Sequence, residues 1–132
     1  MQPQPAPATP VLFVFGADCV RGGPAPPTPC LSERGRREAK LVGERFASEK
    51  VQLTRVRSSA WCRCVDTAQL AFGSAKPQVW PALNSFFQGQ GDGDAQGREV
   101  LQAVAALRAS DNWMLVTHQV NITQLTGVYP AM

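Results

Sequence analysis

The hydrophobic positions of the chain fall into two kinds of pattern, short continuous runs and longer stretches with helical spacing. Val11 to Phe15, followed by Gly16, is a run that predicts a buried strand ending at a loop. Leu53 to Arg57 predicts a second strand, and Gln78 to Pro81 predicts a short third one. Asn112 to Thr117 holds a continuous Trp-Met-Leu-Val run, which is typical of a strand buried on both faces.

Helical spacing occupies the stretches between and after these runs. Apolar or small residues recur on one face from Ser32 to about Ser48, and Ser32 is a good N-cap residue. From about residue 60, apolar residues return at steps of four, three and four, which predicts a helix that ends at Gly73. Two further helices are predicted, near residues 95 to 109 and around residues 120 to 126.

The alternation of strands and helices predicts the fold class. It indicates a single three-layer α/β/α domain with a mainly parallel sheet, which we expect to span residues 11–132. Residues 1–10 contain four prolines and predict a flexible tail, and Asp18 to Cys30, rich in glycine and proline, predicts a long loop. In such sheets ligands bind beyond the carboxyl ends of the strands. The residues that fall there are Gly16, Ser58, Ser59 and His118.

Composition narrows the classes of function. At 132 residues the chain fits one domain, which buries roughly two thirds of the surface of its unfolded form. The formal charge is +3, but the basic residues cluster only at Arg34, Arg36 and Arg37, so we expect no nucleic-acid partner. The run from Val11 to Phe15 is too short for a signal peptide or a membrane span. A cytoplasmic protein without a membrane partner is therefore expected.

The cysteines, Cys19, Cys30, Cys62 and Cys64, lack the paired spacing of a zinc site, and the single histidine lies far downstream. We expect no metal and no organic cofactor, and the cysteine pattern does not require an oxidising compartment. Cys30 and Arg36 match the C-x5-R spacing of cysteine-dependent phosphatases, but prolines precede Cys30 where that motif needs a strand. Cys62 and Cys64 are expected to be small core residues or neighbours of the pocket.

Separate segments of the chain carry a motif that resembles the histidine phosphatase superfamily, also called phosphoglycerate mutase-like. The resemblance covers roughly residues 31 to 127, and it implies a phosphoglycerate mutase-like fold and phosphorylated substrates. The matching segments are Leu31-Ser32-Glu33-Arg34-Gly35, Ser58-Ser59-Ala60-Trp61-Cys62-Arg63 with Asp66-Thr67-Ala68, and Val116-Thr117-His118-Gln119.

The resemblance also implies roles for individual residues. Arg63 matches an arginine that holds phosphate in the family, a task suited to a guanidinium that grips two oxygens. His118 matches the family's second histidine, which stabilises charge, and we expect both residues in the pocket and in any catalysis. Gly16 stands where the family has its nucleophilic histidine, and Phe15 where it has an arginine. The resemblance therefore implies a divergent member without the Arg-His nucleophile motif.

Further polar residues of the matched segments are candidates for the same pocket. Ser58 and Ser59 could donate hydrogen bonds to phosphate or cap the following helix. Asn84 lies where many relatives place an acidic proton donor, but an amide cannot give up a proton at neutral pH. Asp92 or Asp94 could supply the acid from the glycine-rich loop instead.

Three hypotheses of function follow. The first is a phosphate-binding pocket with impaired catalysis, whose partner is a phosphorylated small molecule or the phosphate anion. The second is an active phosphomonoesterase that uses a relocated nucleophile, and the third is a partner-binding scaffold without catalysis. Because relatives continue into another strand beyond the position of Met132, we expect the sheet to be without its last strand. Self-association through the exposed sheet edge is the corresponding expectation.

Overall fold

A computed structural model describes residues 11–17, 19–20, 30–89 and 91–128. The predicted tail at residues 1–10 and most of the predicted loop at 18–30 lie outside the described residues. Helices and strands alternate along the rest of the chain, as predicted. The elements are β1 (Val11–Phe15), α1 (Glu33–Ser48), β2 (Arg55–Ser58), α2 (Cys62–Phe72), β3 (Gln78–Val79), α3 (Gly93–Ala105), β4 (Trp113–Thr117) and α4 (Gln119–Thr126), with short 3-10 helices at Gly73–Ala75, Pro81–Leu83 and Phe87–Gly89.

The four strands form one sheet in the order β1-β4-β2-β3, and every pair of neighbours is parallel. β4 lies in the middle, with Leu115 opposite Phe13 of β1 on one side and Arg57 of β2 on the other. This central position explains why Met114, Leu115, Val116 and Thr117 are all fully buried. The prediction of a strand buried on both faces is therefore confirmed.

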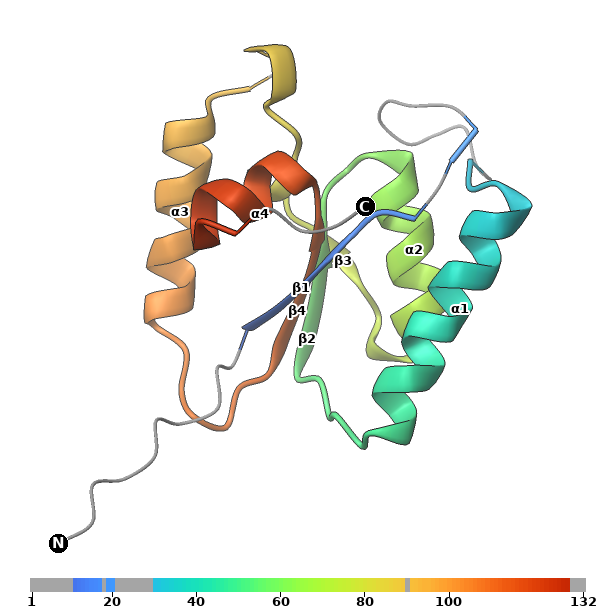
Figure 1. Ribbon diagram of the computed structural model, residues 1–132. Helices are drawn as coiled ribbons and strands as arrows, with labels where there is room; N and C mark the ends of the chain where they lie inside the picture. The colour runs from blue at the N-terminus through green and yellow to red at the C-terminus, as the bar shows by residue number, and fades with distance from the viewer. Residues whose placement is uncertain (1–10, 18, 21–29, 90, 129–132) are drawn as a thin grey trace, which may run out of the picture.

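Helices cover both faces of the sheet, so the predicted three-layer arrangement is confirmed (Figure 1). α1 and α2 pack together on one face, over a core that contains Val56, Met114 and Val116. α3 and α4 lie over the other face, where Leu115 packs with Leu83 and neighbouring apolar residues.

Some elements begin or end two to four residues from their predicted positions. β2 begins at Arg55 rather than at Leu53, because Thr54 is hydrogen-bonded to Asn112 across the start of the sheet. α3 begins at Gly93, since the side chain of Asp92 accepts a hydrogen bond from the backbone N–H of Ala95 and so caps the helix. It ends at residue 105 rather than near 109.

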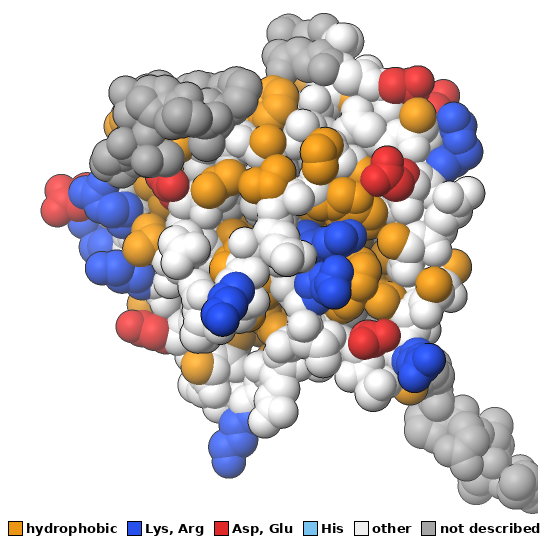
Figure 2. Space-filling view, turned by 180° about the vertical axis from the view of Figure 1, so that it is seen from behind, with side chains coloured by type: hydrophobic (Ala, Val, Ile, Leu, Met, Phe, Trp, Pro, Cys, Tyr) orange, Lys and Arg blue, Asp and Glu red, His pale blue; other side chains and the backbone are white. Residues whose placement is uncertain are grey.

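Aromatic and basic side chains cover part of the sheet near β2 and β3. The guanidinium of Arg57 lies over the ring of Trp80 at 4.3 Å and over the ring of Trp113 at 5.2 Å from the ring centroids. Trp80 is held in turn, because its indole N–H donates to the Glu99 carboxylate at 2.8 Å. Figure 2 shows basic side chains surrounded by hydrophobic ones in the middle of the view from behind.

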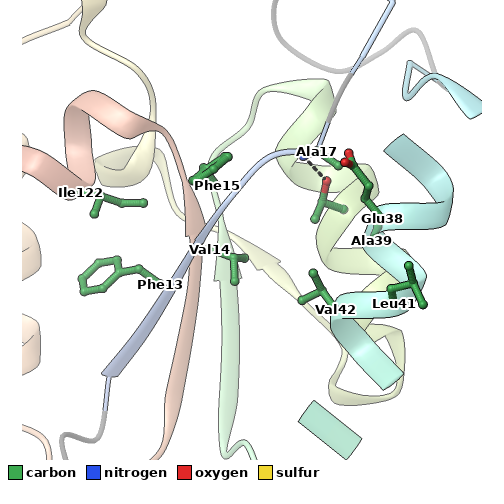
Figure 3. Close-up of a pocket in the computed structure, with 10 residues that line it drawn as sticks. Phe13, Val14, Phe15, Ala17, Glu38, Ala39, Leu41, Val42 and Ile122 are labelled. Atoms are coloured by element: carbon green, nitrogen blue, oxygen red, sulfur yellow. Dashed lines mark hydrogen bonds between the residues drawn. The ribbon is translucent and has the colours of Figure 1, made fainter. Parts of the chain in front are cut away.

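β1 lies at one edge of the sheet, and among the described residues it pairs only with β4. A largely apolar cavity of about 540 Å³ runs beside it (Figure 3). Val14 of β1 and Val42 of α1 line the cavity on one side, and Phe13 of β1 and Ile122 of α4 line it on the other. No helix of the described ranges is both long and apolar enough to cross a membrane.

Candidate functional site

The carboxyl ends of three neighbouring strands bring the predicted site residues together. Gly16 follows β1, and its N–H donates to the carbonyl oxygen of Thr117 at 3.2 Å. Ser59 follows β2, and its N–H donates to the carbonyl oxygen of Val116 at 2.9 Å. His118 follows β4 directly. Because β4 lies between β1 and β2, these short connections place Gly16, Ser59 and His118 at one edge of the sheet.

His118 is held in a fixed position at the centre of this group. Its Nε2 lies 2.8 Å from the hydroxyl oxygen of Ser59, and its ring meets that of Trp61 edge to face, with centroids 5.7 Å apart. Burial, together with the nearby positive charge of Arg63, lowers the pKa of His118 from 6.5 to about 4. The imidazole is therefore neutral at neutral pH.

Hydrogen bonds around Ser59 indicate which nitrogen of His118 carries the proton. The Ser59 hydroxyl donates to the side-chain oxygen of Asn84 at 3.2 Å and accepts from the backbone N–H of Trp61 at 3.1 Å. Its remaining lone pair can then accept from His118, so Nε2 is the donor. This assignment leaves Nδ1 of the neutral ring with a free electron pair, which could accept a proton or attack an electrophile.

Asn84 supports this network rather than supplying an acid. Its side-chain oxygen accepts from the backbone N–H of Ala60 at 2.8 Å as well as from Ser59. Its backbone carbonyl accepts from the side-chain amides of Gln96 at 2.7 Å and Asn121 at 2.9 Å. The residue thus ties the end of β2 to α3 and α4.

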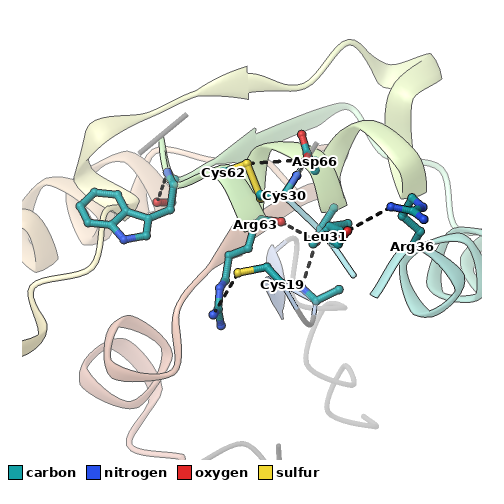
Figure 4. The surroundings of a disulfide bond; sticks show 11 residues. Cys19, Cys30, Leu31, Arg36, Cys62, Arg63 and Asp66 are labelled. Carbon is teal, nitrogen blue, oxygen red and sulfur yellow. Dashed lines mark hydrogen bonds between the residues drawn. A yellow bond between two sulfur atoms is a disulfide. The ribbon is translucent and has the colours of Figure 1, made fainter. Parts of the chain in front are cut away.

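Arg63 lies against the backbone of Gly16. A Cβ atom at position 16 would come within 2.5 Å of Cγ and 2.7 Å of Cδ of Arg63, so the arginine stem fills the space that a side chain there would need. The guanidinium donates from Nη2 to the sulfur of Cys19 at 3.4 Å (Figure 4). The absence of a side chain at residue 16 is thus what allows the observed position of Arg63.

A threonine on α2 fixes the loop after β1 relative to Arg63. The hydroxyl of Thr67 accepts from the backbone N–H of Ala17 at 2.9 Å and donates to the backbone carbonyl of Arg63 at 2.6 Å. Thr67 is itself buried. Thr67 belongs to one of the matching motifs, but the motif alone suggests no role for it. Its contacts show that it couples the first strand to the first turn of α2.

The other predicted residues lie in more structural positions. Ser58 is the last residue of β2, is buried, and accepts from the backbone N–H of Trp80 at 2.8 Å through its carbonyl. Asp92 caps α3, and Asp94 is exposed in the first turn of that helix. These positions give neither aspartate a contact with His118 or Arg63.

The structure contains a disulfide that the sequence did not predict. Cys30 and Cys62 form a disulfide, with Cα atoms 6.1 Å apart (Figure 4). Cys62 is therefore not a simple core residue, and Cys30 is not the thiol of a C-x5-R phosphatase motif. The guanidinium of Arg36 donates instead to the carbonyl oxygen of Leu31 at 3.1 Å. The two cysteines are 32 positions apart, a separation that gives no sequence signal for their pairing.

Cys64 does behave as a small core residue beside the site. It is fully buried, its thiol donates to the carbonyl oxygen of Thr117 at 3.3 Å, and its sulfur lies 3.7 Å from Nε2 of His118. Burial raises the pKa of this thiol to about 12. Cys64 is therefore protonated at any physiological pH, which makes it a poor nucleophile.

Two cavities of the described region lie beside this group. The cavity at the edge of β1 is lined by Ala17 and Thr67, among others, but not by Ser59, Arg63 or His118. A cavity of about 450 Å³ next to α4 is lined by Phe86, Phe87 and Gln119, with further residues of α4.

Solved structures with the same fold are phosphatases and related proteins. YhfR of Bacillus stearothermophilus superimposes with a TM-score of 0.66 and 16% identity, over 89% of this chain and 77% of that one. A mutant phosphoserine phosphatase from Entamoeba histolytica, in complex with phosphoserine, superimposes with a TM-score of 0.63 and 14% identity, over 86% of this chain and 75% of that one. Mycobacterial glucosyl-3-phosphoglycerate phosphatase with VO3 superimposes with a TM-score of 0.65 and 19% identity, over 87% of this chain and 77% of that one. Identities this low establish the fold alone.

Sequence comparison identifies the family. Curated proteins give no match to the chain. The family model described as histidine phosphatase superfamily (branch 1) matches residues 20–98, which is more than half of the chain. The match contains α1, β2 and α2, the elements that position Arg63 and Ser59. The chain therefore belongs to branch 1 of the histidine phosphatase superfamily.

Proposed function

We propose that this chain is a phosphate-binding member of the superfamily with impaired catalysis, in effect a pseudophosphatase. The observation that carries the proposal is the contact between Gly16 and Arg63. By the family resemblance, position 16 is where the nucleophilic histidine stands, and here it has no side chain. Phe15 likewise has no charge to offer a phosphate where the family has arginine. The chain has a single histidine, His118, and it follows a different strand.

Two side chains, Arg63 and His118, would hold the anion, and Ser59 would position His118. The Arg63 guanidinium offers paired donors that match two phosphate oxygens. Its hydrogen bond to Cys19 engages one nitrogen only, so the guanidinium has donors left for an anion. A dianion beside His118 would raise the pKa of the imidazole and favour a second cationic donor. Ser59 would orient that ring through the 2.8 Å contact with Nε2.

We infer that the ligand is a phosphorylated small molecule or phosphate itself. Support comes from the family and from the neighbours of the same fold, of which one was solved with phosphoserine and another with VO3. By the family resemblance, we expect the segments that follow β1 and precede α3 to set the choice of molecule.

Protection against unfolding tests binding. A ligand at 100 times its dissociation constant stabilises the folded state by about 2.7 kcal/mol, so inorganic phosphate should raise the melting temperature of the wild type. Arg63→Ala should lose this protection. Arg108→Ala is the matched control, because Arg108 is an exposed arginine between α3 and β4, at the opposite end of the sheet. Equal protection of all three proteins would refute a pocket at Arg63.

An active phosphomonoesterase is the alternative, and the state of His118 favours it. A neutral imidazole with a free electron pair on Nδ1 could serve as the relocated nucleophile. Without such a replacement, loss of the family's nucleophile would reduce turnover by about four to six powers of ten. Hydrolysis of an aryl phosphate between pH 4 and 8, absent from Arg63→Ala, with a trapped phosphoenzyme, would establish this alternative over the pseudophosphatase.

A scaffold that self-associates through β1 is the third candidate. The strand Val11–Phe15 is uncharged, and in the described region its outer edge faces the apolar cavity rather than another strand. Two copies related by a two-fold axis could pair their β1 strands antiparallel, with Phe13 at the centre. Sedimentation velocity should then show mass rising with concentration, and Phe13→Lys should abolish the rise. A monomer at all concentrations would exclude this candidate.

A further inference from the structure

Three potential metal ligands meet at the start of α2. The sulfur atoms of Cys30 and Cys62 and a carboxylate oxygen of Asp66 all lie within 4.8 Å of one another. The two cysteines are buried and Asp66 is half-buried. Figure 4 shows the three side chains converging from α2 and from the segment that precedes α1. The cluster is separate from the proposed anion site, although Cys62 directly precedes Arg63.

Local structure explains why the three groups converge. Cys62 and Asp66 are four positions apart on α2, so their side chains share one face of the helix. The backbone N–H of Cys30 donates to Oδ2 of Asp66 at 3.0 Å, which fixes Cys30 over the same face. The same oxygen lies 3.7 Å from the sulfur of Cys62. This spacing does not depend on the disulfide alone, because the Cys30 backbone is held independently.

The spacing suits a tetrahedral ion. Zinc binds thiolate sulfur at about 2.3 Å and carboxylate oxygen at about 2.0–2.2 Å, which separates neighbouring ligands by about 3.5–4 Å. Once the bond between the two sulfurs is broken, they need only a small displacement to reach that separation. Two thiolates and one carboxylate carry three negative charges, which a buried site tolerates only with a compensating cation.

We propose that Cys30, Cys62 and Asp66 form a site for a thiophilic divalent cation such as Zn²⁺ when the disulfide is reduced. A dithiol reductant gives the disulfide two electrons and two protons, and is itself oxidised to a disulfide. Binding of the cation then releases the two thiol protons to solvent. Three protein ligands leave the fourth position of a tetrahedral ion open to a ligand from outside the set.

The proposed site gives the segment before α1 two alternative attachments to α2. The disulfide holds Cys30 in the oxidised protein, and the cation holds it in the reduced one. Both attachments act on the residue next to Arg63, and the reduced, metal-free protein lacks both of them.

Cadmium titration of the reduced protein tests the proposal, because Cd²⁺–thiolate bonds absorb in the ultraviolet. We expect one Cd²⁺ per chain after reduction and removal of the reductant, displaced by Zn²⁺, and none in the oxidised protein. Cys62→Ser should abolish the absorption, and Asp66→Asn should weaken binding by about tenfold or more. The matched control is Cys19→Ser combined with Cys64→Ala, which removes the other two thiols and should bind like the wild type.

Circular dichroism recorded in the same titration keeps the test decisive. If the reduced, metal-free protein unfolds, Zn²⁺ should restore the native spectrum of the wild type but not that of Cys62→Ser. Folded, reduced wild type that binds no Cd²⁺, or binding retained in Cys62→Ser, would overturn the proposal. Loss of binding in the Cys19 and Cys64 control would also overturn it, since the absorption would then belong to other thiols.

Discussion

His118 shows how burial sets the charge of a single residue. The ring sits among Ser59, Trp61 and Cys64 with a cationic neighbour, so its charged form is disfavoured. Among the described residues, the proposed anion site therefore combines a permanent cation, Arg63, with an imidazole that becomes a cation only in acid or beside an anion. This difference governs both stability and anion affinity.

Folding stability should decline in mild acid because of His118. The folded-state pKa of about 4 lies below the unfolded value of 6.5, so the neutral ring contributes stability that is fully present above pH 6.5. That stability is lost as the pH falls from 6.5 towards 4, by about 2–3 kcal/mol. Urea denaturation at pH 7.5 and 4.5 measures the loss. The His118→Gln variant cannot titrate at this position, so its loss of unfolding free energy between the two pH values should be smaller than that of the wild type by about 2–3 kcal/mol. Identical losses in the two proteins would contradict the assigned pKa.

Restoring the family's nucleophile tests the role assigned to position 16. Phe15→Arg with Gly16→His should produce at least trace hydrolysis of an aryl phosphate. The new imidazole must displace Cγ and Cδ of Arg63, which are the flexible part of that side chain, so the cost is moderate. Gly16→His with Arg63→Ala serves as the control and should stay inactive. If Phe15→Arg with Gly16→His folds but shows no activity, that result would count against the family mapping of residues 15 and 16.

Sequence motifs located the site residues better than they assigned their contacts. Gly16, Ser59 and His118 come together as predicted, because parallel strand order puts their strand ends side by side, and α2 brings Arg63 to Gly16. The disulfide could not be predicted, since its cysteines lie on different elements whose packing decides whether they meet. The support of Ser59 by Asn84 likewise depends on the path of the chain after β3.

At the scale of elements, the close packing of α1 against α2 depends on Gly43. A Cβ atom at Gly43 would collide with the carbonyl oxygen and Cα of Ala71, which are backbone atoms that cannot rotate away. The two helices therefore approach more closely than alanine would permit. Gly97 of α3 differs, because a Cβ atom there would meet only the flexible end of the Gln124 side chain, which can move away.

The two glycines make a matched pair of substitutions. Gly43→Ala should destabilise the protein by about 1–3 kcal/mol, because α1 and α2 must move apart. Gly97→Ala should be neutral or stabilising by up to about 1 kcal/mol, since alanine is the better helix former and Gln124 can shift. Chemical denaturation of both variants measures the difference. An equal effect of the two would contradict the close contact at Gly43.

The disulfide should be a major source of stability for the start of α2. By the loop-entropy estimate, a crosslink between residues 32 positions apart contributes roughly 3–4 kcal/mol. Reduction in the absence of divalent cations should therefore lower the denaturation midpoint strongly. Cys62→Ser should do the same without reductant, while Cys64→Ala should keep its sensitivity to reduction. A reduced protein as stable as the oxidised one would exclude a structural role for the bond.

Element order was predictable from hydrophobic spacing, but the precise ends of elements were not. The start of β2 depends on the hydrogen bonds between Thr54 and Asn112, which are 58 positions apart in the chain. The ends of α1 and α2 were predicted more closely, because Ser32 caps one and Gly73 follows the other.

At the scale of the molecule, the sheet order explains where chemistry is possible. β4 in the centre places His118 between the ends of β1 and β2, and α2 brings Arg63 over Gly16. The described elements around the proposed anion site match the superfamily fold, and glycine stands at position 16, where the family mapping expects the nucleophile. The fold, together with this mapping of position 16, is the basis of the proposed pseudophosphatase.

Calorimetric titration with an aryl phosphate at neutral pH tests that claim most directly, since binding and hydrolysis both produce heat. We predict saturable heats with one site per chain, a baseline that returns after each injection, and no heats in Arg63→Ala. A baseline displaced by continuous heat, and abolished in Arg63→Ala, would show turnover and contradict the proposal. So would the absence of any difference between the two proteins, because the pocket would then not bind phosphate through Arg63.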